Sequence, residues 1–189
     1  ENRKEAAARA LEIASLAIGR DSQTALAAFM RAANYQPEDF WTRIELGGAQ
    51  LVFGQSIPAL ETYRVALAIA EALAGRDLAC TQWQRDLSVS HIKIGNVLVA
   101  QGDGPRALTA YRKSLAIRET LAGRDPANTE WQRDLSVSHD RIGDVLVAQG
   151  DGPGALAAYR TSLAIRKTLA GREPANTQWQ HDLSLSHNR

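Results

Sequence analysis

The chain lacks the features of a disulfide-rich, zinc-binding or membrane-spanning protein. Cys80 is the only cysteine in 189 residues, which excludes an internal disulfide and a cysteine-ligated zinc cluster. No apolar run approaches the roughly 20 residues that a transmembrane helix needs, and the N-terminal residues ENRKEAAARA contain no apolar core of a signal peptide. We therefore expect a cytoplasmic protein that does not enter the membrane.

An excess of charge of one sign is also missing. Lys and Arg together number 22 and Asp and Glu 21, so the net charge is +1. This balance argues against a surface dedicated to nucleic acid or to an anionic membrane. The alternating apolar pattern of β-strands is absent as well, and this predicts an all-α fold.

The sequence is instead dominated by repetition. Residues 83–130 return as residues 131–178, and 39 of the 48 aligned positions are identical. Self-similarity at such a spacing is typical of solenoids, in which copies of one supersecondary unit stack and bury a shared core. We predict an α-α solenoid of stacked antiparallel helical hairpins with about nine helices.

The repeated unit predicts its own two helices and the register of the chain. Apolar positions at steps of three and four indicate a first helix over about residues 129–148. Gly150 and Gly152 interrupt this pattern, and Pro153 is suited to the first turn of a second helix. The register predicts one array over residues 1–189, with approximate repeats 3–36, 37–78, 79–126, 127–174 and a partial repeat 175–189.

The first and last repeats carry separate expectations. The third helix is expected to begin near Pro37, and the first helix to bury an apolar face formed by Ala10, Ile13, Leu16 and Ala17. The last repeat stops before its second helix. We therefore expect that the protein continues past residue 189, or that a second copy of the chain covers the final helix.

A glycine, an alanine and a tyrosine recur at fixed spacing in the paired helices. Ala155 follows Gly143 by twelve positions and Tyr159 follows four later, a pattern that resembles the tetratricopeptide repeat. The same three positions are Gly95, Ala107 and Tyr111 in one further copy, and Gly47, Ala59 and Tyr63 in another. The 48-residue period exceeds the family's usual length of about 34. It is similar to the lengthened repeats of kinesin light chains and of bacterial multidomain proteins with such arrays.

The resemblance implies a right-handed superhelix whose concave groove is lined by the first helices and binds peptides or partner proteins. Copies of the unit differ on one stripe of that helix, at positions such as Ile92 against Asp140 and Asn96 against Asp144. Such a stripe is either plain solvent surface or a tailored contact, and its apolar members favour a contact. The predicted partner-binding residues are Trp41, Ile44, Arg85, Val89, Ile92, Asn96, Val99, Arg133, Val137, Asp140, Asp144, Val147, Leu185 and Asn188.

One ligand of the family is not expected. Some members hold the C-terminal carboxylate of a chaperone with lysines and asparagines on this stripe. Here Ile44, Ile92 and Asp140 stand where the lysine would be, and only Asn96 matches.

Three histidines recur with the repeat and raise the question of a metal site. Because His91, His139 and His187 belong to successive layers, we interpret them as hydrogen-bonded structural residues, with a metal site as the alternative. Trp83, Trp131 and Trp179 recur in the same way, and we interpret them as core anchors in preference to a ligand cage.

No residues are predicted to be catalytic. The QGDG turns lack the lysine of a phosphate-binding loop, and the Ser, His and Asp residues of the DLSVSHD segment follow the helical period without an oxyanion hole. No cofactor or metal is expected.

These observations favour a non-catalytic interaction scaffold that takes a peptide or protein in its groove. The alternative is a regulatory or oligomerising arm of a larger bacterial signalling or effector enzyme, for which the flanking sequence would decide. Binding of single-stranded RNA would need a basic groove, and Asp140 and Asp144 argue against one.

Overall fold

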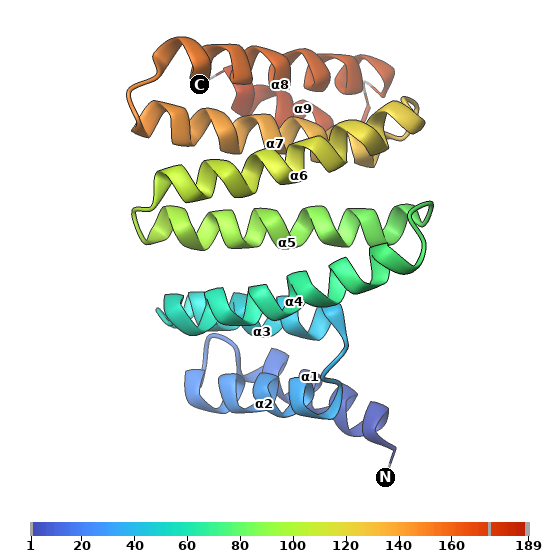
Figure 1. The fold of residues 1–189 in the computed structure, drawn as a ribbon, viewed down its shortest axis with the longest axis vertical. Helices are drawn as coiled ribbons and strands as arrows, with labels where there is room; N and C mark the ends of the chain where they lie inside the picture. Colours follow the sequence, from blue (N-terminus) through green and yellow to red (C-terminus); the bar gives the residue numbers. More distant parts are fainter. Residues whose placement is uncertain (1, 174, 188–189) are drawn as a thin grey trace. The chain divides into compact units, whose positions relative to one another are not determined.

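The computed structural model describes residues 2–173 and 175–187, and within them every regular element is an α-helix (Figure 1). The predicted all-α class and the number of helices are confirmed for this described part. The helices are α1 (Arg3–Ala17), α2 (Ser22–Tyr35), α3 (Phe40–Val52), α4 (Ser56–Arg76), α5 (Thr81–Ala100), α6 (Gly104–Arg124), α7 (Thr129–Ala148), α8 (Gly152–Arg172) and α9 (Thr177–His187).

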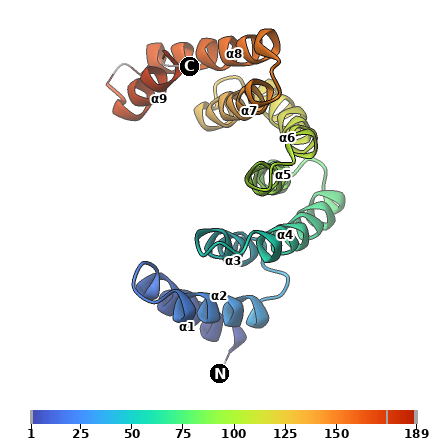
Figure 2. The same cartoon turned by 90° about the vertical axis from the view of Figure 1, so that its left-hand side faces the viewer.

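The chain divides into two compact units between Gln101 and Gly102, in the turn that follows α5. The first unit contains α1 to α5 and the second α6 to α9. Within each unit every helix packs on its neighbours along the chain, as Figure 2 shows for α1 against α2 and for α7 against α8. The predicted repeat boundaries within one array stay a prediction.

Side-chain caps start the helices where the repeat register places the turns. The carboxylate of Asp151 accepts a hydrogen bond from the backbone N–H of Gly154 at 2.9 Å, and Pro153 follows at the start of α8. Asn128 caps α7 by accepting from the N–H of Trp131 at 3.1 Å. Gly150 ends the preceding turn with a φ of 81°, a conformation that costs glycine little.

The apolar face predicted for α1 was wrong at Ile13 and Leu16, whereas Ala10 is buried as predicted. Ile13 and Leu16 are 42% and 66% exposed, whereas the buried residues of this helix are Ala7, Ala10 and Ala14. Because alanine has a small side chain, the alanine stripe lets α1 approach α2 closely, and Ile13 and Leu16 are turned toward solvent. The core of this region contains Ala14, Ala28, Phe29, Ala33, Leu46 and Ala49.

The third helix also begins later than predicted. Pro37 lies in a turn, and α3 starts at Phe40, where the carboxylate of Asp39 accepts from the N–H of Thr42 at 2.7 Å. This cap satisfies the first turn and sets the start of the helix. As a result α3 has 13 residues, against 20 in α5 and in α7.

Candidate interaction surface

The paired helices are held at short distance by a glycine that faces a tyrosine. A Cβ placed on Gly143 of α7 would lie 2.5 Å from Cε1 of Tyr159 in α8, and a Cβ placed on Gly47 of α3 would lie 2.5 Å from Cε1 of Tyr63 in α4. Burial raises the pKa of Tyr63 to about 12, so its hydroxyl stays neutral. This close packing fixes the rotation of α3 and α7, and with it the residues that point away from the second helices.

Three apolar residues of the predicted stripe are openly exposed. Trp41 on α3 is 50% exposed, Val99 on α5 is 47% exposed and Val147 on α7 is 57% exposed. Arg133 is also exposed. The half-buried members of the stripe are Arg85, Val89, Asn96, Val137 and Asp144.

Three predicted contact residues are instead buried. Ile44 and Ile92 are buried. Asp140 is also buried, and its carboxylate accepts a hydrogen bond from the guanidinium of Arg166 on α8. The expectation that Asp140 edges the groove is therefore corrected, because a buried charge must be paired and its partner lies inside the unit.

Two members of the predicted set cannot be placed. The side chain of Leu185 and the whole of Asn188 lie outside the described residues. The sequence-based assignment of these two residues stays a prediction.

Buried arginines link successive helices in the second unit, a feature that the sequence analysis missed. Arg118 of α6 donates to the backbone oxygen of Asp134 at 2.7 Å and to Oγ of Ser138 at 3.1 Å. Arg166, one repeat later, donates to the backbone oxygen of Asp182 at 3.1 Å. The available signal was an arginine at the same place in two copies among otherwise apolar positions, with Ala70 at that place in the earlier copy.

An exposed arginine also bridges the first helices of neighbouring repeats. Nε of Arg133 on α7 donates to Oδ2 of Asp182 on α9 at 2.8 Å. The same guanidinium lies over the ring of Trp179, with its carbon 5.8 Å from the ring centroid. An ion pair and a cation–π contact therefore hold one guanidinium at this place.

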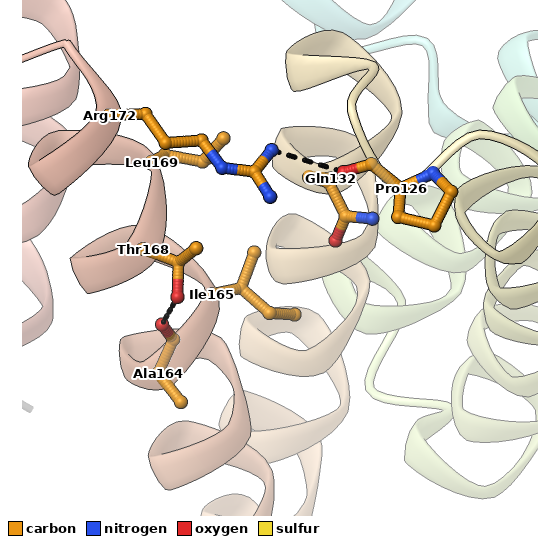
Figure 3. Close-up of a pocket in the computed structure, with 7 residues that line it drawn as sticks. All are labelled: Pro126, Gln132, Ala164, Ile165, Thr168, Leu169 and Arg172. Atoms are coloured by element: carbon orange, nitrogen blue, oxygen red, sulfur yellow. Dashed lines mark hydrogen bonds between the residues drawn. The ribbon is translucent and has the colours of Figure 1, made fainter.

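A small cavity of about 270 Å³ lies in the second unit, at the end of α8 (Figure 3). Arg172 donates to the backbone oxygen of Pro126 across its rim at 3.1 Å, and Gln132 projects from α7. The first unit has a cavity of about 360 Å³ at the corresponding part of α4. The matching residues are Ala68 and Ala164, Ile69 and Ile165, Ala72 and Thr168, Leu73 and Leu169, and Arg76 and Arg172.

Two of the repeated histidines, His91 and His139, lie within the packed helices. His91 is buried and His139 is half-buried. Burial lowers the pKa of His139, against the opposing effect of nearby Glu119 and Asp140. Among the residues whose placement is described, no group of three His, Cys, Asp or Glu side chains is arranged to hold a metal ion. The side chain of His187 lies outside that set.

The glycine–tyrosine pairs and the helical hairpins agree with the repeat family that the sequence resembles. Residues 92–128 and 140–176 each match the model of the tetratricopeptide repeat family. These two segments are tetratricopeptide repeats. The sequence prediction of this family is confirmed, and the family's repeats generally serve as protein-interaction scaffolds. No match to the sequence was found among curated proteins.

Solved structures show the same fold at low sequence identity. BtubC (BKLC) from P. vanneervenii matches 87% of this chain with a TM-score of 0.72 and 20% identity; the match covers 65% of BtubC, just under two thirds of its length. A putative kinesin light chain from Podosopora anserina, described as having nearly identical TPR-like repeats, matches 100% of this chain with a TM-score of 0.70 and 18% identity, and 87% of that chain is covered.

A third solved structure, a MamA RS-1 double mutant, matches 88% of this chain and 76% of its own, with a TM-score of 0.59 and 16% identity. At these identities the likeness concerns the fold alone. In the tetratricopeptide array itself, none of the helices that the structure describes is long and apolar enough to cross a membrane.

Proposed function

We propose that the array is a non-catalytic scaffold that binds a peptide or protein partner on the exposed stripe of its first helices. The observation that carries this proposal is the exposure of Trp41, Val99 and Val147 at positions that the helix packing does not use. Exposed apolar side chains on a soluble surface favour a contact, and an aromatic side chain is a frequent anchor of an interface.

The charges around these residues support a partner of mixed character. Arg133 is exposed on the stripe of α7 and Asp144 is half-buried on the same helix. Asp144 accepts a hydrogen bond from the hydroxyl of Tyr159 at 2.8 Å, which orients its carboxylate. Apolar anchors edged by charges of both signs suit an extended or helical segment with apolar residues at its centre.

The test measures the affinity of the partner for two sets of variants. Both sets introduce a lysine at an exposed apolar position, one set on the first helices and the other on the second helices. Partners are first captured from a lysate of the source cells by cross-linking to the 189-residue chain and identified, and their affinities are then measured with purified proteins. Trp41→Lys and Val147→Lys are expected to weaken binding by at least tenfold, since a buried contact is replaced by a charge that must be desolvated.

The matched controls place the same lysine on exposed apolar positions of the second helices. Ile57 of α4 is 72% exposed and Leu156 of α8 is 49% exposed. Ile57→Lys and Leu156→Lys are expected to leave the affinity unchanged. Loss of binding in these controls, with full binding in the Trp41 and Val147 variants, would move the binding surface to the second helices and overturn the proposal.

A further inference from the structure

In the second unit, Asp182 and Trp179 of the last repeat hold Arg133 of the preceding repeat. Asp182 uses its two carboxylate oxygens for different donors: Oδ1 accepts from Nε2 of Gln178 and Oδ2 accepts from Nε of Arg133, each at 2.8 Å. The ring of Trp179 forms the floor under the guanidinium. One repeat therefore supplies the arginine, and the next supplies the carboxylate and the ring.

The first unit repeats the carboxylate and the ring. In α5 the segment TQWQRD carries Gln82, Trp83 and Asp86 at the places of Gln178, Trp179 and Asp182. Nε2 of Gln82 donates to Oδ1 of Asp86 at 2.8 Å, the same bond at the same length as in the last repeat. In both copies the glutamine therefore occupies Oδ1 of the carboxylate, and Oδ2 is the oxygen that accepts from the arginine in the last repeat.

The arginine is missing from this copy. Arg133 precedes Asp182 by 49 positions, and the residue 49 positions before Asp86 is Pro37. Proline has no side chain that donates a hydrogen bond. Moreover, α3 begins only at Phe40, so the helical turns that carry Trp131 and Arg133 in α7 have no counterpart beside the start of α5.

The second carboxylate oxygen of Asp86 stays within reach of a ligand. The residue as a whole is only 5% exposed. In the described part of the chain, the buried side-chain oxygens that lack a partner belong to Ser114 and Ser162. Oδ2 of Asp86 accepts no hydrogen bond there and is not among them, so the exposed edge of this side chain includes Oδ2.

We propose that Asp86 and Trp83 form a receptor for an arginine side chain of the bound partner, which takes the place that Arg133 takes beside Asp182 and Trp179. The guanidinium would donate to Oδ2 of Asp86 and lie over the ring of Trp83. A carboxylate beside an aromatic face selects a planar cation, because the guanidinium can form the ion pair and the stacking contact together. Desolvation raises the pKa of Asp86 against the opposing effects of the Gln82 hydrogen bond and nearby Arg85, and a partner cation would favour the charged form further.

This inference rests on the proposed function and specifies the chemistry of the partner, which must carry an arginine. The first test uses the 189-residue chain and a single-residue probe, Nα-acetyl-arginine N-methylamide, titrated in two-dimensional ¹H–¹⁵N NMR. The expected result is a saturable shift of the Trp83 indole N–H, identified by its loss in Trp83→Phe, and of the Gln82 side-chain amide. The citrulline counterpart has the same shape without the charge and is expected to cause no such shift.

Variants then locate the site. Asp86→Asn keeps the shape of the side chain and is expected to weaken binding of the arginine probe by about tenfold, as loss of a charge-assisted pair should. Glu45→Gln removes one negative charge from an exposed position of α3 and serves as the matched control, with unchanged binding expected. Circular dichroism of each variant checks that the helices are retained.

Three results would overturn the inference: equal binding of arginine and citrulline by the natural chain, equal binding of arginine by the Asp86→Asn variant, or equal binding of the lysine counterpart. The first and third need no variant, so they decide the question even if a variant fails to fold. If Trp41→Lys and Val147→Lys weaken partner binding while Asp86→Asn binds arginine normally, the proposed function stands and this inference fails. If the arginine probe binds at Asp86 while the stripe variants bind the partner normally, the stripe proposal fails and this one stands.

Discussion

Gly143 has no room for a side chain, because the ring of Tyr159 occupies the space next to its Cα. A Cβ at residue 143 would lie 2.5 Å from Cε1 and 2.8 Å from Cδ1 of that ring. The ring is itself fixed, since the hydroxyl of Tyr159 donates to Oδ1 of Asp144 at 2.8 Å. The close packing of α7 against α8 therefore requires glycine at position 143, where only a hydrogen atom fits.

Gly143→Ala is expected to destabilise the protein by about 1–3 kcal/mol through overpacking, although alanine favours a helix over glycine by about 1 kcal/mol. Gly171 is the matched control, because it also lies in a helix and has no atom within 4 Å of the added Cβ. Gly171→Ala is expected to leave the melting temperature unchanged or raise it. Thermal melts followed by circular dichroism measure both, and an equal response of the two variants would contradict the packing argument.

The buried pair of Asp140 and Arg166 gives a second prediction. Arg166→Met alone leaves a buried carboxylate without its partner and is expected to cost roughly 3 kcal/mol in the free energy of unfolding. The double variant Asp140→Ile with Arg166→Met is expected to recover most of that loss, because apolar residues often replace a buried ion pair well. The chain already has this solution at the same repeat positions, where Ile44 and Ala70 are buried.

Urea unfolding of the single and double variants measures this coupling. A double variant as unstable as Arg166→Met would show that the hydrogen bonds of Arg166 to the backbone oxygen of Asp182 and to Oγ of Ser136 matter more than its ion pair.

Asp86 gives a prediction about pH. Its pKa in the folded protein is raised above 3.8, chiefly because burial disfavours the charged carboxylate. The folded state therefore binds the proton more tightly than the unfolded state does, and the contribution of Asp86 to stability grows as the pH falls through the folded pKa toward 3.8. At neutral pH the burial of the charged carboxylate outweighs its hydrogen bond from Gln82 and the nearby charge of Arg85, so the charged form of Asp86 destabilises the fold.

Asp86→Asn is accordingly expected to raise the melting temperature at pH 7 and to lose this advantage below the pKa of the unfolded side chain. Melts of the natural chain and the variant from pH 7 to acidic pH measure the difference directly. A variant that is less stable than the natural chain at pH 7 would contradict the prediction, since it would show that the carboxylate has a stabilising partner.

Two buried hydroxyl groups offer the last prediction. Oγ of Ser114 and Oγ of Ser162 are buried without a hydrogen-bond partner in the described structure, and the earlier copy has Ala66 at the same repeat position. An unsatisfied buried hydroxyl costs about 1–3 kcal/mol. Ser162→Ala is therefore expected to keep or increase stability.

Ser138→Ala is the contrasting control for this pair of hydroxyls. Its Oγ accepts a hydrogen bond from Arg118 at 3.1 Å inside the second unit. Removal of this acceptor is expected to lower the melting temperature. If Ser162→Ala destabilised the protein as much as Ser138→Ala does, Ser162 would have a partner that its geometry does not suggest.

The helices, their pairing and the family follow from the sequence, because they depend on local order along the chain. Period and turn residues place a helix wherever apolar positions recur at three and four, and two nearly identical copies report the register directly. The prediction failed where the repeat is least regular. The start of α3 depends on the capping bond of Asp39, and the buried face of α1 depends on close packing of Ala7, Ala10 and Ala14 against its neighbour.

The candidate surface was predictable only in part, because the exposure of a residue depends on side chains that are distant in sequence. The stripe predicted Trp41, Val99 and Val147 as surface residues, and these three are exposed, whereas their role in binding stays a prediction. In the sequence Asp140 resembles any other acidic residue on a helix face. Its ion-pair partner Arg166 lies 26 positions further along the chain. The amino-acid order thus specifies which positions repeat and which helices form, whereas the choice between a surface charge and a buried ion pair arises when α7 and α8 pack, because desolvation is compensated only once both partners are in place.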